Sequence, residues 1–145
     1  MIPPARLVDY FFALQLDPEA SEEHQARVYY CYPPLQDGKD DTLRNIVPFC
    51  FPSGVEFPKN TSVAYHDFVL TDERGQKKFA CCLKTRKIKM GPTTEDDEDE
   101  AVSCFCLVSC QPRFNTLRAC LHAFYSLASE GKAEEFILRL MYQVF

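Results

Sequence analysis

The sequence carries YYCYPP at residues 29–34, IVPFCFP at 46–52 and FVLTD at 68–72. Each phrase is apolar enough to lie in a core, and the first two end on proline, which has no amide hydrogen to continue a β-ladder. We therefore expect strand ends or buried extended segments at these phrases. Cys31 and Cys50, one in each of the first two phrases, are expected to be small buried hydrophobes.

The first third of the chain predicts a β-hairpin, followed by a short helical turn and an extended segment. Residues 7–16 (LVDYFFALQL) form an apolar, aromatic-rich run typical of a central strand, and residues 26–32 form a second strand that pairs with it. Residues 42–46 predict a short helical turn that ends before Pro48. Residues 49–51 are expected to be extended between two prolines.

The middle of the chain has the alternation of paired strands. Apolar and polar residues alternate over 62–71, DERG at 72–75 is a turn signal, and KKFACCLKTRKIK returns from residue 77 as the second strand of a hairpin. Residues 101–110 (AVSCFCLVSC) form a buried strand. We expect it at the centre of the sheet or beside the hairpin.

The last third of the chain changes to a helical period. Pro112 lies near the start of the first predicted helix, Asn115 or Thr116 is a candidate cap, and Gly131 ends it or joins it to a second helix over 133–142. Strands first and helices last predict an α+β fold, an antiparallel sheet of about five strands flanked by helices, two of them C-terminal. The apolar stripe of the first helix comprises Leu117, Cys120, Leu121, Phe124, Leu127 and Ala128.

Length and charge narrow the class of protein. A chain of 145 residues suits a single domain spanning 1–145. The net charge of −5 is local, because six consecutive acidic residues occupy 95–100 within a loop, 90–100, that we expect to be mobile. KTRKIK at 84–89 is interpreted as an edge strand protected by its basic residues, with contact to phosphate or anionic lipid as the alternative. Nucleic-acid binding is disfavoured.

The eight cysteines show no C-x-x-C spacing of the kind found in zinc or thioredoxin-like sites. In strands, Cys104 and Cys106 would share one face, whereas Cys81 and Cys82 would point to opposite faces. We expect all eight to be buried, reduced thiols, which indicates the cytosol, and disulfide or metal bonding is the alternative. The remaining cysteines are Cys31, Cys50, Cys110 and Cys120.

The sequence offers few candidates for catalysis. His66 next to Asp67, with cysteines nearby, suggests a Cys–His nucleophile, but neighbours on a strand point apart, so we expect His66 to be a surface or half-buried residue. Arg113 and Arg118 flank the start of the first C-terminal helix and are expected to face water, with carboxylate binding as the alternative. We assign no catalytic residue, no metal and no cofactor, and no membrane-spanning run or targeting signal is visible.

Several phrases, in order, resemble the upstream DENN module, the N-terminal lobe of DENN-domain proteins. They are LVDYFFALQLD at 7–17, VYYCYPP at 28–34, VPFCFPSG at 47–54, FVLTDERGQKKFACCL at 68–83 and SCFCLVSCQPRF at 103–114. The resemblance covers nearly the whole chain and implies a fold similar to the longin domain. Ala80 stands where the family often has glycine, and the acidic insert is particular to this chain.

The resemblance also implies a function. DENN-domain proteins are guanine nucleotide exchange factors for Rab GTPases in membrane and vesicle traffic, and their Rab-binding surface is formed jointly by this lobe and a larger downstream lobe, absent from this chain. Such a protein is cytoplasmic, or peripheral on vesicle or endosomal membranes. It regulates a GTPase without a catalytic constellation of its own, and the resemblance marks no partner-binding residue by position. The alternative is a longin-like adaptor or dimerisation scaffold without exchange activity. An enzyme that uses the cysteines is a third, weaker interpretation.

Overall fold

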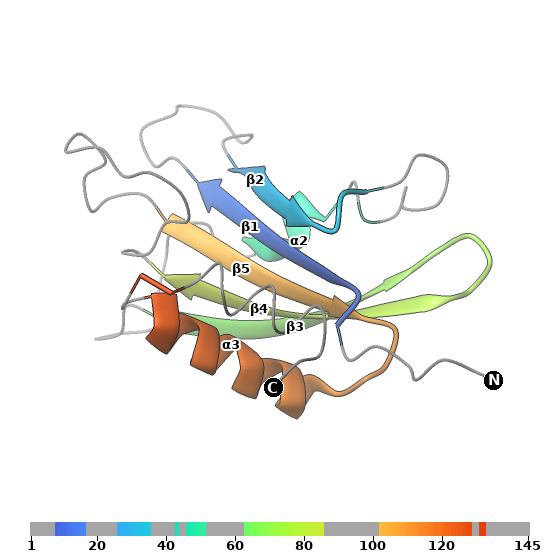
Figure 1. Cartoon of the computed structure of the whole chain (residues 1–145). Helices are drawn as coiled ribbons and strands as arrows, with labels where there is room; N and C mark the ends of the chain where they lie inside the picture. The colour runs from blue at the N-terminus through green and yellow to red at the C-terminus, as the bar shows by residue number, and fades with distance from the viewer. Residues whose placement is uncertain are drawn as a thin grey trace.

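The structure is a computed structural model that describes residues 8–16, 26–35, 43, 46–51, 63–85, 102–128 and 131–132. These residues form a five-stranded antiparallel sheet in the order β2-β1-β5-β4-β3, with helices on its faces (Figure 1). The predicted α+β class and antiparallel sheet are confirmed. The second predicted C-terminal helix (133–142) and the acidic loop (90–100) lie outside the described residues.

The predicted N-terminal hairpin is present. β1 (Tyr10–Leu16) pairs antiparallel with β2 (Ala26–Tyr32), with a register shift between Ala13 and Leu14. β2 stops where predicted, at Tyr32 before Pro33, and the Tyr32–Pro33 peptide bond is cis. On its other side β1 pairs with β5 (Val102–Ser109), which is buried along its whole length and occupies the centre of the sheet.

The predicted DERG hairpin is also confirmed. β3 (Val63–Thr71) and β4 (Lys77–Thr85) pair antiparallel around a turn in which Asp72 Oδ1 accepts hydrogen bonds from the amides of Arg74 (2.9 Å) and Gln76 (2.8 Å). Gly75 has φ +81°, a left-handed conformation that glycine adopts without a Cβ clash.

The interpretation of the KTRKIK strand as a protected sheet edge is wrong where the structure describes it. β4 lies between β5 and β3, so the edge is β3, and Lys84 is only 4% exposed. The cause is β5, which follows the acidic insert in the chain and pairs with the side of β4 that β3 leaves open. Arg86, Lys87 and Lys89 lie outside the described residues.

A long helix, α3 (Phe114–Ala128), covers one face of the sheet (Figure 1). Its predicted apolar stripe packs on the strands, and the Phe124 ring lies 5.3 Å from that of Phe11 and 4.7 Å from that of Phe105 between centroids. The Arg113 carbonyl accepts the first helical hydrogen bond from the Leu117 amide (3.0 Å), so the predicted caps Asn115 and Thr116 instead lie inside the helix.

The predicted end of α3 at Gly131 is confirmed. Gly131 has φ +78° and donates its amide to the Ala128 carbonyl (3.1 Å), while the Lys132 amide bonds the Leu127 carbonyl (2.9 Å). This is the hydrogen-bond pattern of a Schellman cap, which needs a left-handed residue and so favours glycine.

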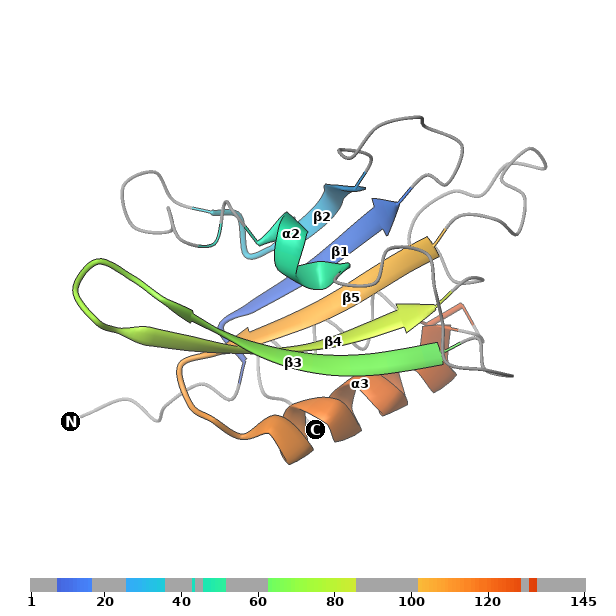
Figure 2. The same cartoon turned by 180° about the vertical axis from the view of Figure 1, so that it is seen from behind.

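A one-turn helix, α2 (Val47–Cys50), lies on the opposite face of the sheet from α3 (Figure 2). The prediction that the helical turn ends before Pro48 and that residues 49–51 are extended is therefore wrong. Proline is tolerated in the first turn of a helix because its missing amide hydrogen has no intrahelical acceptor there. Cys50 is buried as predicted, but on a helix and not at a strand end.

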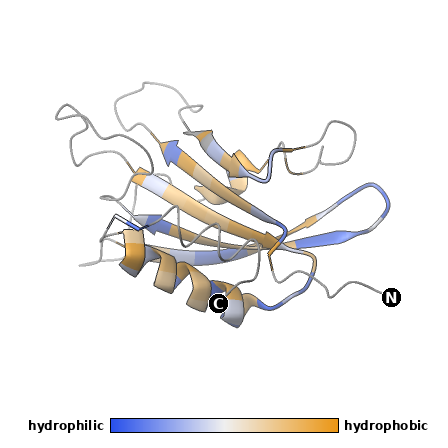
Figure 3. Ribbon diagram, viewed as in Figure 1, coloured by the Kyte–Doolittle hydropathy of each residue, from blue (hydrophilic) through white to orange (hydrophobic). Residues whose placement is uncertain are grey.

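The distribution of hydropathy follows these layers. The central strands and the sheet-facing side of α3 are apolar, whereas the β3–β4 turn is hydrophilic (Figure 3). Among the described residues, no helix is long and apolar enough to cross a membrane.

Candidate interaction surface

β3 is the outermost strand on its side of the sheet, and its side chains divide between the two faces as the alternation predicted. Val63 and Tyr65 pack toward the α3 side, whereas Phe68 and Leu70 pack toward the α2 side. Val69 is an exposed large hydrophobic residue, at 44%. An edge strand presents backbone groups that another chain can pair with, so this edge is a candidate surface for protein contact.

On the α3 side, polar groups from β3 and α3 form a connected cluster. Arg118 Nη2 lies 3.5 Å from Asp67 Oδ2, and the Arg118 guanidinium lies 5.3 Å from the centre of the Tyr65 ring. The Tyr65 hydroxyl and His122 Nδ1 are 3.4 Å apart. Arg118 faces water, as expected, with its side chain 49% exposed, and it also pairs with a carboxylate of the chain itself, as the alternative proposed. Arg113 is exposed, as expected.

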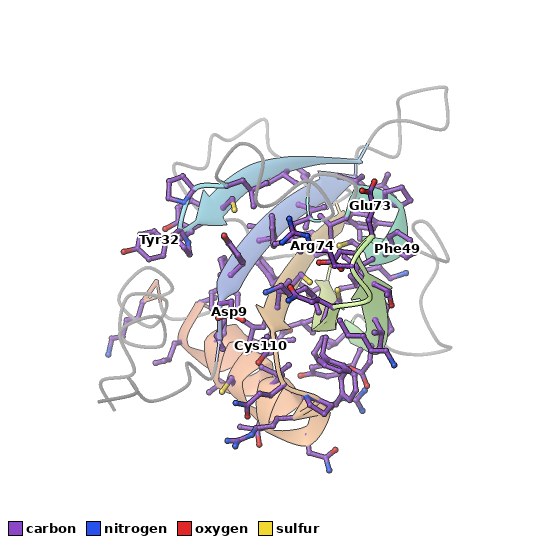
Figure 4. The ribbon with its side chains drawn as sticks, turned by 90° about the vertical axis from the view of Figure 1, so that its right-hand side faces the viewer. Asp9, Tyr32, Phe49, Glu73, Arg74 and Cys110 are labelled. Carbon is purple, nitrogen blue, oxygen red and sulfur yellow. The ribbon has the colours of Figure 1, made fainter. Side chains whose placement is uncertain are left out.

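On the α2 side, aromatic rings from α2 and β3 stack at the surface. The Phe49 and Phe68 rings are 5.5 Å apart, and the His66 and Phe68 rings are 6.1 Å apart. His66 Nε2 lies 2.9 Å from the Phe49 carbonyl oxygen, which accepts its hydrogen bond. Phe49 is 45% exposed, and Figure 4 shows where it lies on α2. Exposed aromatic rings of this kind are typical of protein-contact surfaces.

Beneath this aromatic stack, four thiols meet in the core. Cys50 comes from α2, Cys82 from β4, and Cys104 and Cys106 from β5, and all four are fully buried. The predicted sharing of one face by Cys104 and Cys106, and the opposite directions of Cys81 and Cys82, are confirmed. Spacing in the sequence gave no sign of the cluster, because it depends on strand register and on the α2 turn.

Hydrogen bonds from Cys104, Cys106 and Cys82 lower the pKa of the Cys50 thiol. Burial in apolar surroundings raises the pKa of each of these three neighbours. On the other face, burial and then a hydrogen bond with Asp67 raise the pKa of Cys81 to about 12. All eight cysteines are free, but the prediction that all are buried is wrong for three of them. Cys31 and Cys120 are half-buried, and Cys110 is exposed just before α3 (Figure 4).

The histidines do not assemble a Cys–His nucleophile in the described part of the chain. His66 and Asp67 point to opposite faces, with His66 bonded to the Phe49 carbonyl and Asp67 paired with Arg118. Cys50 lies near His66, but its thiol is fully buried and out of reach of a substrate. His66 is half-buried, as expected, and His24 lies outside the described residues. The exposed aromatic and charged groups along β3 are suited to binding a partner.

Comparison with known proteins gives one match to a family model, over part of the chain. No curated protein matches the chain. The family model of the uDENN domain matches residues 26–85, from the start of β2 to the end of β4. This segment holds the YYCYPP, IVPFCFP and FVLTD phrases that carried the resemblance. The resemblance to the upstream DENN module is thereby confirmed over residues 26–85.

Proposed function

We propose that residues 1–145 form a single longin-like domain that serves as the N-terminal lobe of a guanine nucleotide exchange factor for a Rab GTPase. The uDENN match over residues 26–85 carries this proposal. The five-stranded antiparallel sheet with α3 on one face supports it, because it is the architecture that the resemblance implies. The partners are then the GTPase and a downstream lobe of the same protein.

Exchange requires no acid, base or nucleophile from the protein. A factor that binds the nucleotide-free GTPase more tightly than the nucleotide-bound form lowers the affinity for nucleotide by the same ratio. What the lobe must supply is contact surface. The β3 edge, with the Arg118–Asp67–Tyr65 cluster on one side and the Phe49–Phe68 stack on the other, offers both polar and apolar groups.

This function places the protein in the cytoplasm, with peripheral attachment to vesicle or endosomal membranes where its GTPase acts. The contact with the membrane would then be indirect or superficial. Expression of a fluorescent fusion, with fractionation of the same cells, tests this placement. Recovery of the protein in the lumen of an organelle would contradict it.

The test is release of a fluorescent guanine nucleotide from a panel of purified Rab GTPases. The chain alone is expected to accelerate release little or not at all, and the longest product of its gene is expected to accelerate release from at least one Rab. Deletion of residues 1–145 from that product should abolish the acceleration. Acceleration of none of the Rabs by the longest product would refute exchange activity.

The second candidate is an adaptor that dimerises without exchange activity, and the exposed β3 edge with Val69 and Phe49 favours it. An exposed apolar edge is prone to pair with a second copy. Light scattering at several concentrations separates the two candidates. A tight dimer of the longest gene product, combined with no nucleotide release, would support the adaptor.

A further inference from the structure

Three of the four buried thiols of the α2 face lie close enough together to hold one metal ion. The Sγ atoms of Cys50, Cys82 and Cys106 all lie within 4.8 Å of one another, and Cys104, two residues before Cys106 on the same face of β5, packs in the same buried cluster. Three separate segments supply them: α2, β4 and β5. A single buried thiol is common in a protein core. Four thiols brought together from three segments form the kind of donor set that binds a soft metal ion.

Strand register explains how these thiols converge. Cys82 and Cys106 are direct cross-strand partners, and Cys104 is the partner of Lys84 in the next same-facing row. Cys82 and Lys84 are two residues apart on β4, so both point to the α2 face. α2 places Cys50 against this face.

We propose that Cys50, Cys82, Cys104 and Cys106 bind one zinc ion as thiolates. Zinc bound by cysteine alone is tetrahedral with Zn–S bonds of about 2.3 Å, which sets the sulfur atoms about 3.8 Å apart. The sulfur atoms of Cys50, Cys82 and Cys106, already within 4.8 Å of one another, reach that separation by a contraction of about 1 Å, within the range of small χ1 rotations. Cys104 supplies the fourth thiolate from the same face of β5.

A zinc site of four thiolates carries a net negative charge that neighbouring groups must offset. Four thiolates and one zinc ion carry two net negative charges, which are costly in an apolar core unless cations or hydrogen bonds offset them. The Lys84 side chain is almost fully buried and stands opposite Cys104, and His66 is the cross-strand partner of Cys82. The Lys84 ammonium group offers positive charge toward the α2 face.

The ion would fasten α2 to the two strands beneath it. Because all four thiols are fully buried, it would enter as the chain folds and leave only when this face opens. Zinc replaces the thiol protons on binding, so acid favours its release. Zinc binding at these four cysteines does not require that the protein have exchange activity.

In the test, the full chain is refolded under reducing conditions with one equivalent of zinc sulfate. The folded chain is then purified by gel filtration and weighed by native mass spectrometry. We expect one zinc ion per folded chain, and cobalt(II) in its place should give thiolate charge-transfer bands with the visible absorption of a tetrahedral site. A folded, fully reduced chain without zinc would overturn the proposal. A chain whose mass shows the loss of two hydrogens, from a disulfide among these four cysteines, would do so as well.

Cys82→Ala and Cys81→Ala form a matched pair, since the two residues are adjacent and equally buried but face opposite sides of the sheet. We expect Cys82→Ala to bind cobalt at least about tenfold more weakly, a loss of about 1.4 kcal/mol or more. Cys81→Ala and the exposed-site variant Cys110→Ala should bind as the parent does. If Cys82→Ala does not fold, Cys106→Ala takes its place. Equal cobalt binding by the cluster variant and Cys81→Ala would also overturn the proposal.

Discussion

The two faces of the sheet are packed in different ways. On one face, α3 spans fifteen residues and buries a cluster of large side chains centred on Phe11, Phe105 and Phe124. On the other, α2 has four residues and covers a core that combines Phe12 and aliphatic side chains with four thiols. The α3 face is therefore stabilised by aromatic packing under one long helix, whereas the α2 face combines apolar area with small polarisable groups from several segments.

The largest expected effect is on the α3 face. Phe124→Ala should lower the free energy of unfolding by about 3–5 kcal/mol, because it leaves a cavity between Phe11 and Phe105. Guanidinium titration followed by circular dichroism measures the loss. Thr116→Ala, on the exposed side of the same helix, is the control and should change little. A loss for Phe124→Ala below about 1 kcal/mol would mean that α3 does not carry the core.

Alkaline pH tests the burial of the Cys81 thiol on the α3 face. An unfolded cysteine ionises at about pH 8.5, whereas the native Cys81 thiol, with its pKa raised to about 12, stays protonated. The contribution of Cys81 to stability is therefore complete below about pH 8.5 and is lost as the pH rises toward 12, by at most about 1.4 kcal/mol per pH unit. Denaturant titrations at several pH values measure it.

Cys81→Ala is expected to flatten this part of the pH dependence. Cys110→Ala is the matched control, because Cys110 is exposed in the folded chain. An identical alkaline loss of stability in Cys81→Ala and in the parent would contradict the assignment to Cys81.

The aromatic stack at the rim of the α2 face should contribute less. Phe49→Ala removes one partner of the Phe49–Phe68 pair and is expected to cost about 1 kcal/mol, since Phe49 is nearly half exposed. Phe49→Leu, which keeps apolar area without the ring, separates stacking from burial. A cost above about 3 kcal/mol would show that Phe49 acts as a core residue.

The ion pair at the rim of the α3 face should contribute least. Asp67→Asn and Arg118→Gln, with the double variant, are expected to give a coupling energy below about 1 kcal/mol that falls with added salt, because the pair is solvent-exposed. A coupling that does not respond to salt would show that the pair is shielded, and the contrast between rim and core would fail.

Much of the fold was predictable because it follows from short-range patterns. The alternation in β3, the DERG turn and the apolar period of α3 each specify local structure without reference to the rest of the chain. The prediction that β5 lies at the centre of the sheet or beside the hairpin is confirmed. The sequence did not show that β5 pairs with β4 in particular, since the acidic insert separates the two strands along the chain. Lys84 was therefore placed at an edge and is instead inside the sheet.

The candidate site was less predictable for a related reason. The predicted helical turn ends before Pro48, although the first turn of a helix accepts proline. Cys50 was therefore predicted to lie in an extended segment, whereas it lies on α2. The thiol cluster then depends on α2 and on the register Cys82–Cys106, and the spacing of cysteines along the chain contains neither. The surface pairing of Arg118 with Asp67 likewise depends on how α3 crosses β3.

The most direct test of the proposed function is the affinity of the longest gene product for a Rab GTPase in its nucleotide-free and its nucleotide-bound forms. The account predicts binding of the nucleotide-free form tighter by at least about tenfold, or 1.4 kcal/mol, and loss of this preference when residues 1–145 are deleted. Equal affinity for the two forms across the panel, or a preference unchanged by the deletion, would contradict it.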